Sequence, residues 1–239
     1  MTKKSNQSYI TKHKKYIDYR IKNISSYVAS HADHLTSISE IISILTNELS
    51  QSKPLNQLIK CNETLVDLFE LKSLIDDWEI LKDGDIVGYI YQEIQNLSDK
   101  KKKGQYFTPD EVVDYIVQKS LNQVQNNNIK ILDPACGSGQ FLISTFKHLL
   151  KSTNLSKKEI VTNCISGFDI DPIAITIAKY NLHKISGCAK NKINIHNLDY
   201  LFFDDLNLSN NNFLQQKYDL IIGNPPWRSK FTAEEKKIL

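Results

Sequence analysis

The spacing of apolar residues changes after Lys103, and this change constrains the fold more than any other feature of the sequence. Beyond it, four short apolar runs alternate with stretches whose apolar residues recur at helical spacing. The runs are Ile129–Leu132, Ile165–Phe168, Ile193–Leu198 and Tyr218–Ile222. Amphipathic helices are expected over Phe141–Leu150, between the first two runs, and over Ile173–Leu182, between the second and third. Strands that alternate with helices predict an α/β fold with a parallel sheet.

The first hundred residues are predicted to form a separate helical region. Apolar residues recur there every three or four positions, first in Ile41, Ile42, Leu45 and Leu49 and again between Leu65 and Ile75. No pattern in this region indicates chemistry, which favours a role in packing or partner binding. We therefore expect residues 1–100 to be a helical N-terminal region and residues 101–239 to carry the functional site.

Composition limits the setting of the protein more than its function. The 239 residues have a net charge of +3, which is too small to establish a nucleic-acid partner. No apolar stretch approaches the length of a membrane span and no signal peptide is evident, so a cytoplasmic protein without membrane contact is expected. The four cysteines are scattered and form no zinc-type cluster, which favours buried thiols over a metal site.

A polar residue follows each of the four apolar runs. These residues are Asp133, Asp169, Asp199 and Asn224. Because the carboxyl ends of parallel strands meet at one edge of a sheet, where ligands bind, the four side chains are expected to face one crevice. A single aspartate in such a place is ordinary turn chemistry, but the pattern at all four ends suggests a ligand site.

The turn after the first run, Asp133–Gly139, is rich in glycine. Such a turn between a strand and a helix is expected to present bare N–H groups to an anion or to a closely approaching ligand. Leu142 stands where a dinucleotide fingerprint needs its third glycine, so NAD is disfavoured. Asp133 favours a ligand that carries an ammonium group as well as a carboxylate.

The fourth run ends in Gly223 and the tetrad "NPPW", residues Asn224 to Trp227. Consecutive prolines cannot continue a sheet ladder, because neither has an N–H to donate. The strand end is thereby left with an amide and a large aromatic ring as chemical groups.

Four stretches of the sequence together closely resemble the adenine-N6 DNA methyltransferases of type I and fused type II restriction-modification systems. "KKGQYFTPDEVVDYIV" (Lys102 to Val117) resembles the family's first cofactor-contacting motif, and "DPACGSGQFL" resembles its S-adenosylmethionine loop. "GFDIDPIAI" is similar to the ribose-binding segment, and "NPPW" to the catalytic tetrad. The resemblance runs from about Asp85 to Trp227, and four motifs in the family's order are highly specific.

The resemblance implies a Rossmann-like methyltransferase sheet that binds S-adenosylmethionine. The cofactor residues would be Phe107, Thr108 and Pro109 at the methionine part, Asp133, Ala135, Gly137 and Gly139 around its amino-acid end, Asp169 on the ribose, Ile170 on the adenine face and Asp199 on the exocyclic amine. The catalytic residues would be Asn224, Pro225, Pro226 and Trp227.

The chemistry of methyl transfer fits these catalytic residues. The exocyclic nitrogen of adenine is a poor nucleophile, because its lone pair is delocalised into the ring. The Asn224 side-chain oxygen and the Pro225 carbonyl would accept its two hydrogens and free that lone pair. The base must leave the duplex to be reached, and stacking on Trp227 would contribute roughly 1–3 kcal/mol. This chemistry needs no metal and no nucleophilic side chain.

Simpler structural roles stand beside several of these assignments. Thr108 is also expected to be the N-cap of a helix, with Pro109 at its first position, and Asp171 to start its helix rather than bind ligand. The lysine run Lys100, Lys101, Lys102 and Lys103 fits phosphate contacts with DNA, or a solvated loop. Trp227 fits a core position less well than an exposed one.

The family's sheet order, 3-2-1-4-5-7-6, implies strands beyond the four in this sequence. We therefore expect an incomplete sheet and the N-terminal part of a methyltransferase catalytic domain in residues 101–239. It would act on double-stranded DNA with a C-terminal half or a specificity, target-recognition subunit. The alternatives are a methyltransferase that modifies RNA or a protein glutamine, which the segment before the glycine loop disfavours, and an inert cofactor-binding fragment.

Overall fold

The computed structural model describes residues 19, 22–23, 34–46, 85–96, 108–122, 129–200 and 216–225. The chain divides into two compact units, Met1–Lys100 and Lys101–Leu239. In the first unit, helix α2 (His34–Leu45) contacts helix α5 (Ile86–Asn96). Their buried side chains recur at helical spacing and are Ile38, Ile41, Ile42, Leu45, Val87, Ile90, Tyr91 and Ile94. The helical pattern expected between Leu65 and Ile75 lies outside the described residues.

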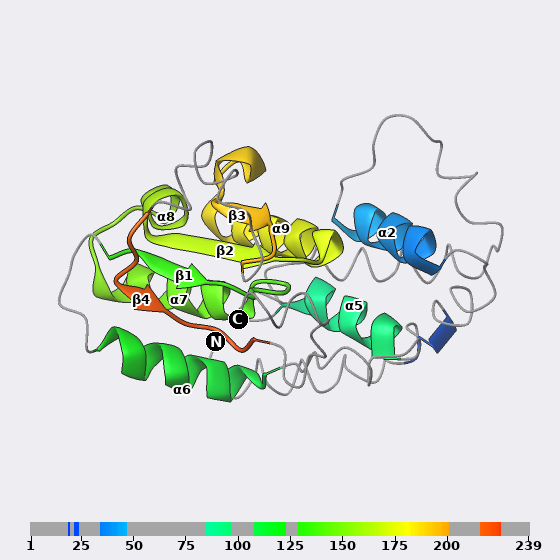
Figure 1. The fold of residues 1–239 in the computed structure, drawn as a ribbon, viewed down its shortest axis with the longest axis horizontal. Helices are drawn as coiled ribbons and strands as arrows, with labels where there is room; N and C mark the ends of the chain where they lie inside the picture. Colours follow the sequence, from blue (N-terminus) through cyan, green and yellow to red (C-terminus); the bar gives the residue numbers. More distant parts are fainter. Residues whose placement is uncertain are drawn as a thin grey trace, which may run out of the picture. The chain divides into compact units, whose positions relative to one another are not determined.

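The second unit contains a parallel sheet of four described strands. They are β1 (Ile131–Asp133), β2 (Ile165–Asp169), β3 (Ile195–Asn197) and β4 (Leu220–Ile221). The strands lie in the order β3-β2-β1-β4 and every neighbouring pair is parallel (Figure 1). The predicted α/β fold is confirmed, and the strand order agrees with the 3-2-1-4 portion that the resemblance implied.

Helices connect and flank these strands. The longer ones are α6 (Asp110–Leu121), α7 (Gln140–Ser152) and α9 (Pro172–Ser186). The shorter ones are α8 (Lys157–Glu159), the π-helical η3 (Ile160–Cys164) and the 3₁₀-helical η4 (Lys190–Lys192). Helix α9 begins as expected, because the Asp171 carboxylate accepts from the backbone N–H groups of Ile173 and Ala174 and Pro172 takes the first position.

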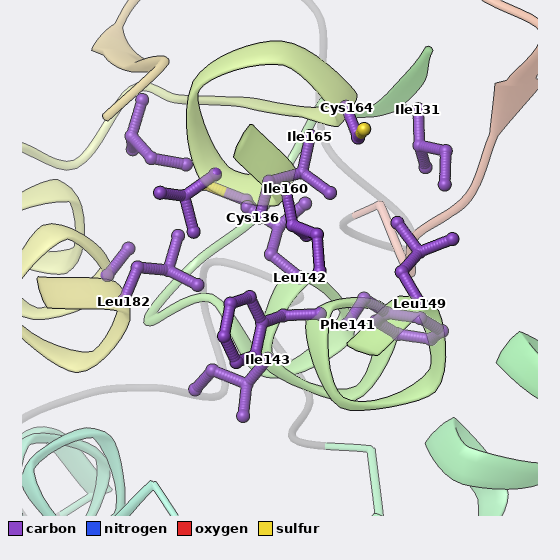
Figure 2. Packing of buried hydrophobic residues seen from close by; sticks show 14 of the residues in the cluster. Ile131, Cys136, Phe141, Leu142, Ile143, Leu149, Ile160, Cys164, Ile165 and Leu182 are labelled. Carbon is purple, nitrogen blue, oxygen red and sulfur yellow. The ribbon is translucent and has the colours of Figure 1, made fainter. Parts of the chain in front are cut away.

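The core of this unit lies where α7 and α9 meet the sheet. Figure 2 shows Leu142 and Leu149 of α7 among Ile131 of β1, Ile165 of β2 and Ile160 of η3, all of them buried. A Cβ on the β2 glycine, Gly167, would stand 2.7 Å from the nearest atom of Leu142. The missing side chain therefore lets α7 rest directly on the sheet.

The cysteines described by the structure belong to this packing. Cys136, Cys164 and Cys188 are buried and carry free thiols, as the sequence predicted. Cys61 lies outside the described residues. Among the helices that the structure describes, none has the length and apolar character of a membrane span.

Candidate functional site

The glycine-rich turn between β1 and α7 is anchored to the carboxyl end of β2. The N–H of Cys136 donates to the Phe168 carbonyl at 2.8 Å. The N–H of Gly137 donates to Oδ2 of Asp169, also at 2.8 Å. Gly139 has a φ of +92°, and a Cβ there would stand 3.2 Å from the Ala178 Cβ of α9. A left-handed backbone and a close helix together explain why this position is glycine.

The sequence predicted that this turn would offer bare N–H groups, and for four of them the prediction is wrong. Beside Cys136 and Gly137, the N–H of Ala135 donates to Oδ1 of Asp133 at 3.1 Å, and that of Gly139 to the Cys136 carbonyl at 2.8 Å. The turn is buried or half-buried, where an unpaired N–H is costly, so β2 and Asp133 supply acceptors. The protein thus fixes the shape of the turn through its own hydrogen bonds.

A residue that sequence reasoning missed supports the same turn from α9. The side-chain amide of Asn181 donates to the Ser138 carbonyl at 3.1 Å. Asn181 is buried, although asparagine usually lies at the surface. Its position in an amphipathic pattern gave no signal of this contact, because the partner depends on how α9 packs.

Asp133 and Gly223 bring the first and fourth strand ends together. The Asp133 side chain is only 1% exposed. A Cβ at position 223 would stand 2.3 Å from Oδ1 of Asp133, so no side chain fits there. The sequence showed Gly223 only as a glycine between a strand and the tetrad. The close approach that requires it becomes visible only in the structure.

Burial raises the pKa of Asp133 to about 7, and repulsion from Asp169 adds to the rise. Burial also raises the pKa of Asp169. Within the described part of the chain, no cationic side chain contributes to either shift. A ligand that carries positive charge would relieve this repulsion, whereas an anionic pyrophosphate would not. The two neighbouring carboxyl groups therefore favour a ligand that brings positive charge to this turn.

Asp169, Ile170 and Asp199 lie close together beside this turn. The Asp169 carboxylate accepts from the N–H groups of Gly137 and Asp171, and a further backbone hydrogen bond comes from Ile170. Since a carboxylate has about four lone-pair sites, it keeps acceptor capacity for a ligand. The Ile170 side chain is 63% exposed, as a hydrophobic surface for a flat ring must be. Asp199 follows Leu198, whose N–H donates to the Asp169 carbonyl at 3.0 Å.

Two further contacts hold the segment around Asp199. The Tyr200 ring stacks on Phe168 of β2, with 5.5 Å between the ring centroids. The Asn197 side-chain amide donates to the Asp169 carbonyl at 2.9 Å. The exposed Asp199 therefore lies between two residues that are tied to β2. The sequence predicted Asp199 as a site residue, but neither of these anchors.

Asn224 meets Thr108, a residue far away in the sequence. Its side-chain nitrogen donates to Oγ1 of Thr108 at 3.0 Å. The expectation that Thr108 caps α6 is wrong, because Pro109 takes that position and its carbonyl accepts from Val112 and Val113. The Thr108 hydroxyl instead contacts the amide that the sequence predicted to be catalytic.

Several predicted residues cannot be placed in this site. Lys100 to Lys103, Phe107, Pro226 and Trp227 lie outside the described residues, and their roles stay predictions. Pro109 and Pro225 are described and both are exposed. The structure thus brings Thr108, Asp133, the glycine turn and Asn224 together, and it joins Asp169, Ile170 and Asp199 to the same turn.

Two methyltransferase relatives are similar to most of this chain. A type II methyltransferase, M.VspI of Vibrio sp., is 29% identical over 81% of the chain and 43% of its own length. The methylase subunit of the type I restriction enzyme MjaVII of Methanocaldococcus jannaschii is 29% identical over 79% of the chain and 33% of its own length. The chain thus spans less than half the length of these two relatives.

A solved structure shares the fold. A Listeria monocytogenes protein assigned to the class I S-adenosylmethionine-dependent methyltransferases matches with a TM-score of 0.51 at 18% identity, covering 93% of this chain and 62% of that protein. The Rossmann-like methyltransferase fold expected from the sequence is thereby confirmed. The family model for N-6 DNA methylases matches residues 82–238, which is more than half of the chain. The strand order, the acidic glycine turn and this match agree, and the chain belongs to the N-6 DNA methylase family.

Proposed function

We propose that this chain takes part in the transfer of a methyl group from S-adenosylmethionine to the exocyclic nitrogen of adenine in DNA. The observation that carries the proposal is the position of Asn224. It follows β4, next to an acidic glycine turn, and its amide is held by Thr108 at 3.0 Å. An amide acceptor beside a cofactor cradle is what activation of an adenine amine requires.

The proposed role of the tetrad is to change the electronic state of the target nitrogen. Asn224 Oδ1 and the Pro225 carbonyl would accept the two hydrogens of the amine and draw the nitrogen toward tetrahedral geometry. The lone pair then becomes available for attack. Trp227 would stack on the flipped base and Pro226 would stiffen the backbone between them. The remaining requirement is alignment, which positioned groups supply without a covalent intermediate.

The cofactor would lie along the carboxyl ends of β1, β2 and β3. It supplies a methyl group on a positively charged sulfur. Asp169 would hold the ribose hydroxyls, Ile170 would lie against the adenine face and Asp199 would accept from the exocyclic amine. Phe107, Thr108 and Pro109 would close the methionine end, beside Ala135, Gly137 and Gly139. Asp133 would act through charge, because its side chain is buried beneath Gly223.

Double-stranded DNA is the proposed substrate, and the lysine run Lys100–Lys103 is proposed to contact its phosphates. The relatives named above are a type II methyltransferase and a methylase subunit of a type I restriction enzyme. By analogy, we propose that this chain acts in a restriction-modification system, in the cytoplasm, and that a C-terminal half or a specificity subunit reads the target sequence.

The test is transfer of tritiated methyl from S-adenosylmethionine to unmethylated DNA, followed by nucleoside analysis. We expect labelled N6-methyladenine from the wild-type protein. If the chain alone transfers no methyl group, its partner subunit is added. Asn224→Ala should abolish transfer and leave cofactor affinity nearly intact. Asp169→Ala should weaken the affinity measured by calorimetry.

The two variants separate the two halves of the proposal. Surviving transfer in Asn224→Ala would refute the role of the tetrad. Unchanged affinity in Asp169→Ala would refute the ribose assignment. Label that appears in RNA or in protein, with none in DNA, would replace the proposed substrate.

A further inference from the structure

We infer that Thr108 is a positioning residue that fixes which way the Asn224 amide faces. The inference deepens the proposed function and rests on it for its meaning, but the contact itself is a property of the fold. The Asn224 nitrogen donates to Oγ1 of Thr108 at 3.0 Å. Both side chains are half-buried, so water competes less for this hydrogen bond than it would at an open surface.

The direction of this hydrogen bond decides what the amide can do. With the nitrogen facing Thr108, the oxygen of the same planar group points to the opposite side, as an acceptor with two lone pairs. A reversed amide would receive a hydrogen bond from the Thr108 hydroxyl and turn its N–H groups outward. An N–H facing an adenine amine places donor against donor, so only the orientation with the nitrogen toward Thr108 can accept from the target.

Thr108 lies two residues before α6, and α6 is itself fixed by contacts with α7. The Gln140 side-chain amide donates to Oδ1 of Asp110, and the Ser144 hydroxyl donates to Oδ1 of Asp114 at 2.5 Å. Each helix advances four residues between the two contacts, so the helices run side by side in one register. Since α7 begins at the glycine turn, the contacts between α6 and α7 also link the segment that carries Thr108 to the proposed cofactor site.

This arrangement distinguishes positioning from cofactor binding. A residue that only contacts the cofactor would affect its affinity when changed. A residue that orients Asn224 would affect the transfer step and leave affinity nearly intact, because the cofactor-contacting groups stay in place. Thr108 lies at the junction of the two sites, so only variants that remove the hydroxyl alone can separate these roles.

The experiment compares Thr108→Val, which keeps the shape and loses the hydroxyl, with Thr108→Ser, which keeps the hydroxyl. Thr176→Val is the matched control, because the Thr176 hydroxyl donates to the Pro172 carbonyl within α9. Two properties are measured on the full chain. One is the side-chain NH₂ signal of Asn224 in a ¹H–¹⁵N spectrum, assigned by its loss in Asn224→Asp. The other is the single-turnover rate of methyl transfer, with S-adenosylmethionine affinity measured alongside.

We expect Thr108→Val to shift the Asn224 NH₂ signals and to slow transfer by about 10-fold or more, since small misplacements at a reacting centre are costly. Cofactor affinity should stay within about twofold, because valine keeps the shape that would lie against the methionine part. Thr108→Ser should keep the wild-type NH₂ signals of Asn224 and the wild-type rate of transfer. Thr176→Val should change neither.

Two results would overturn the inference. One is an Asn224 NH₂ signal that Thr108→Val leaves unchanged. The other is a loss of cofactor affinity as large as the loss in rate, which would mean that the Thr108 hydroxyl acts on the cofactor and not on Asn224. If the wild-type protein and its partner transfer no methyl to adenine, the proposed function fails. The NH₂ signals would still decide whether Thr108 orients the Asn224 amide.

Discussion

At the scale of single residues, the ionisation of Asp133 depends strongly on the fold around it. Its pKa is raised from an ordinary 3.8 to about 7, first by burial and then by the neighbouring Asp169. Between these two values the folded protein binds a proton that the unfolded chain has already released. The stabilisation linked to this proton is complete below pH 3.8 and is lost as the pH rises through about 7.

The corresponding prediction concerns Asp133→Asn. This variant keeps an oxygen that can accept from the Ala135 N–H, and it removes the titratable carboxyl group. Wild-type stability should fall from pH 4 to 7 relative to the variant, by about 4 kcal/mol at most, and the difference should level off above that range. Urea unfolding across this pH range measures it. Asp114→Asn keeps Asp133 and should keep the wild-type slope. Parallel curves for wild type and Asp133→Asn would show that Asp133 does not titrate in this way.

At the scale of secondary-structure elements, α9 owes its start to one side chain. The Asp171 carboxylate accepts from two backbone N–H groups that would otherwise lack a partner. Asp171→Ala should lower the free energy of unfolding by about 1 kcal/mol, the usual effect of losing such a cap. Chemical denaturation at constant pH measures it, and Asp171→Ser should recover most of the loss. Equal losses in both variants would mean that the carboxylate acts through charge instead.

The sequence predicted the elements of the second unit because their periodicity is local. Helix α7 was expected over Phe141–Leu150 and spans Gln140–Ser152, and β2 was expected over Ile165–Phe168 and spans Ile165–Asp169. Helix α8 was not expected, although Ser156 and Glu159 form a capping box whose spacing was legible. Apolar periodicity could not indicate it, because none of its three residues is buried.

The site was predictable where a residue acts through its own chemistry, and hidden where it acts through a partner. Asp169 and Asn224 stood out as polar groups at the ends of apolar runs. The contact between Asn224 and Thr108 joins segments that meet only after the sheet forms, so no local pattern contains it. Two amides of the glycine turn, those of Cys136 and Gly137, were misjudged for the same reason, since their acceptors belong to the neighbouring strand β2.

At the scale of the whole molecule, the lysine run gives a prediction about DNA that does not depend on the placement of its residues. If Lys100 to Lys103 contact phosphates, changing all four to glutamine should reduce the salt dependence of DNA binding. The slope of log affinity against log salt should become less steep by up to about 3 to 4. Fluorescence anisotropy at several salt concentrations measures it. Changing Lys157 and Lys158, the exposed pair on α8, should leave the slope unchanged. An unchanged slope in the first variant would make the run a solvated loop.

The contact between Gly223 and Asp133 also restricts how this chain can evolve. A Cβ at position 223 would stand 2.3 Å from the buried carboxylate, so the first strand end and the fourth share one space. If alanine replaced Gly223 while aspartate remained at 133, the buried Asp133 carboxylate would have to shift. A smaller residue at 133 would remove this obstacle. The residues at the two positions are therefore expected to change together, although the positions lie far apart along the gene.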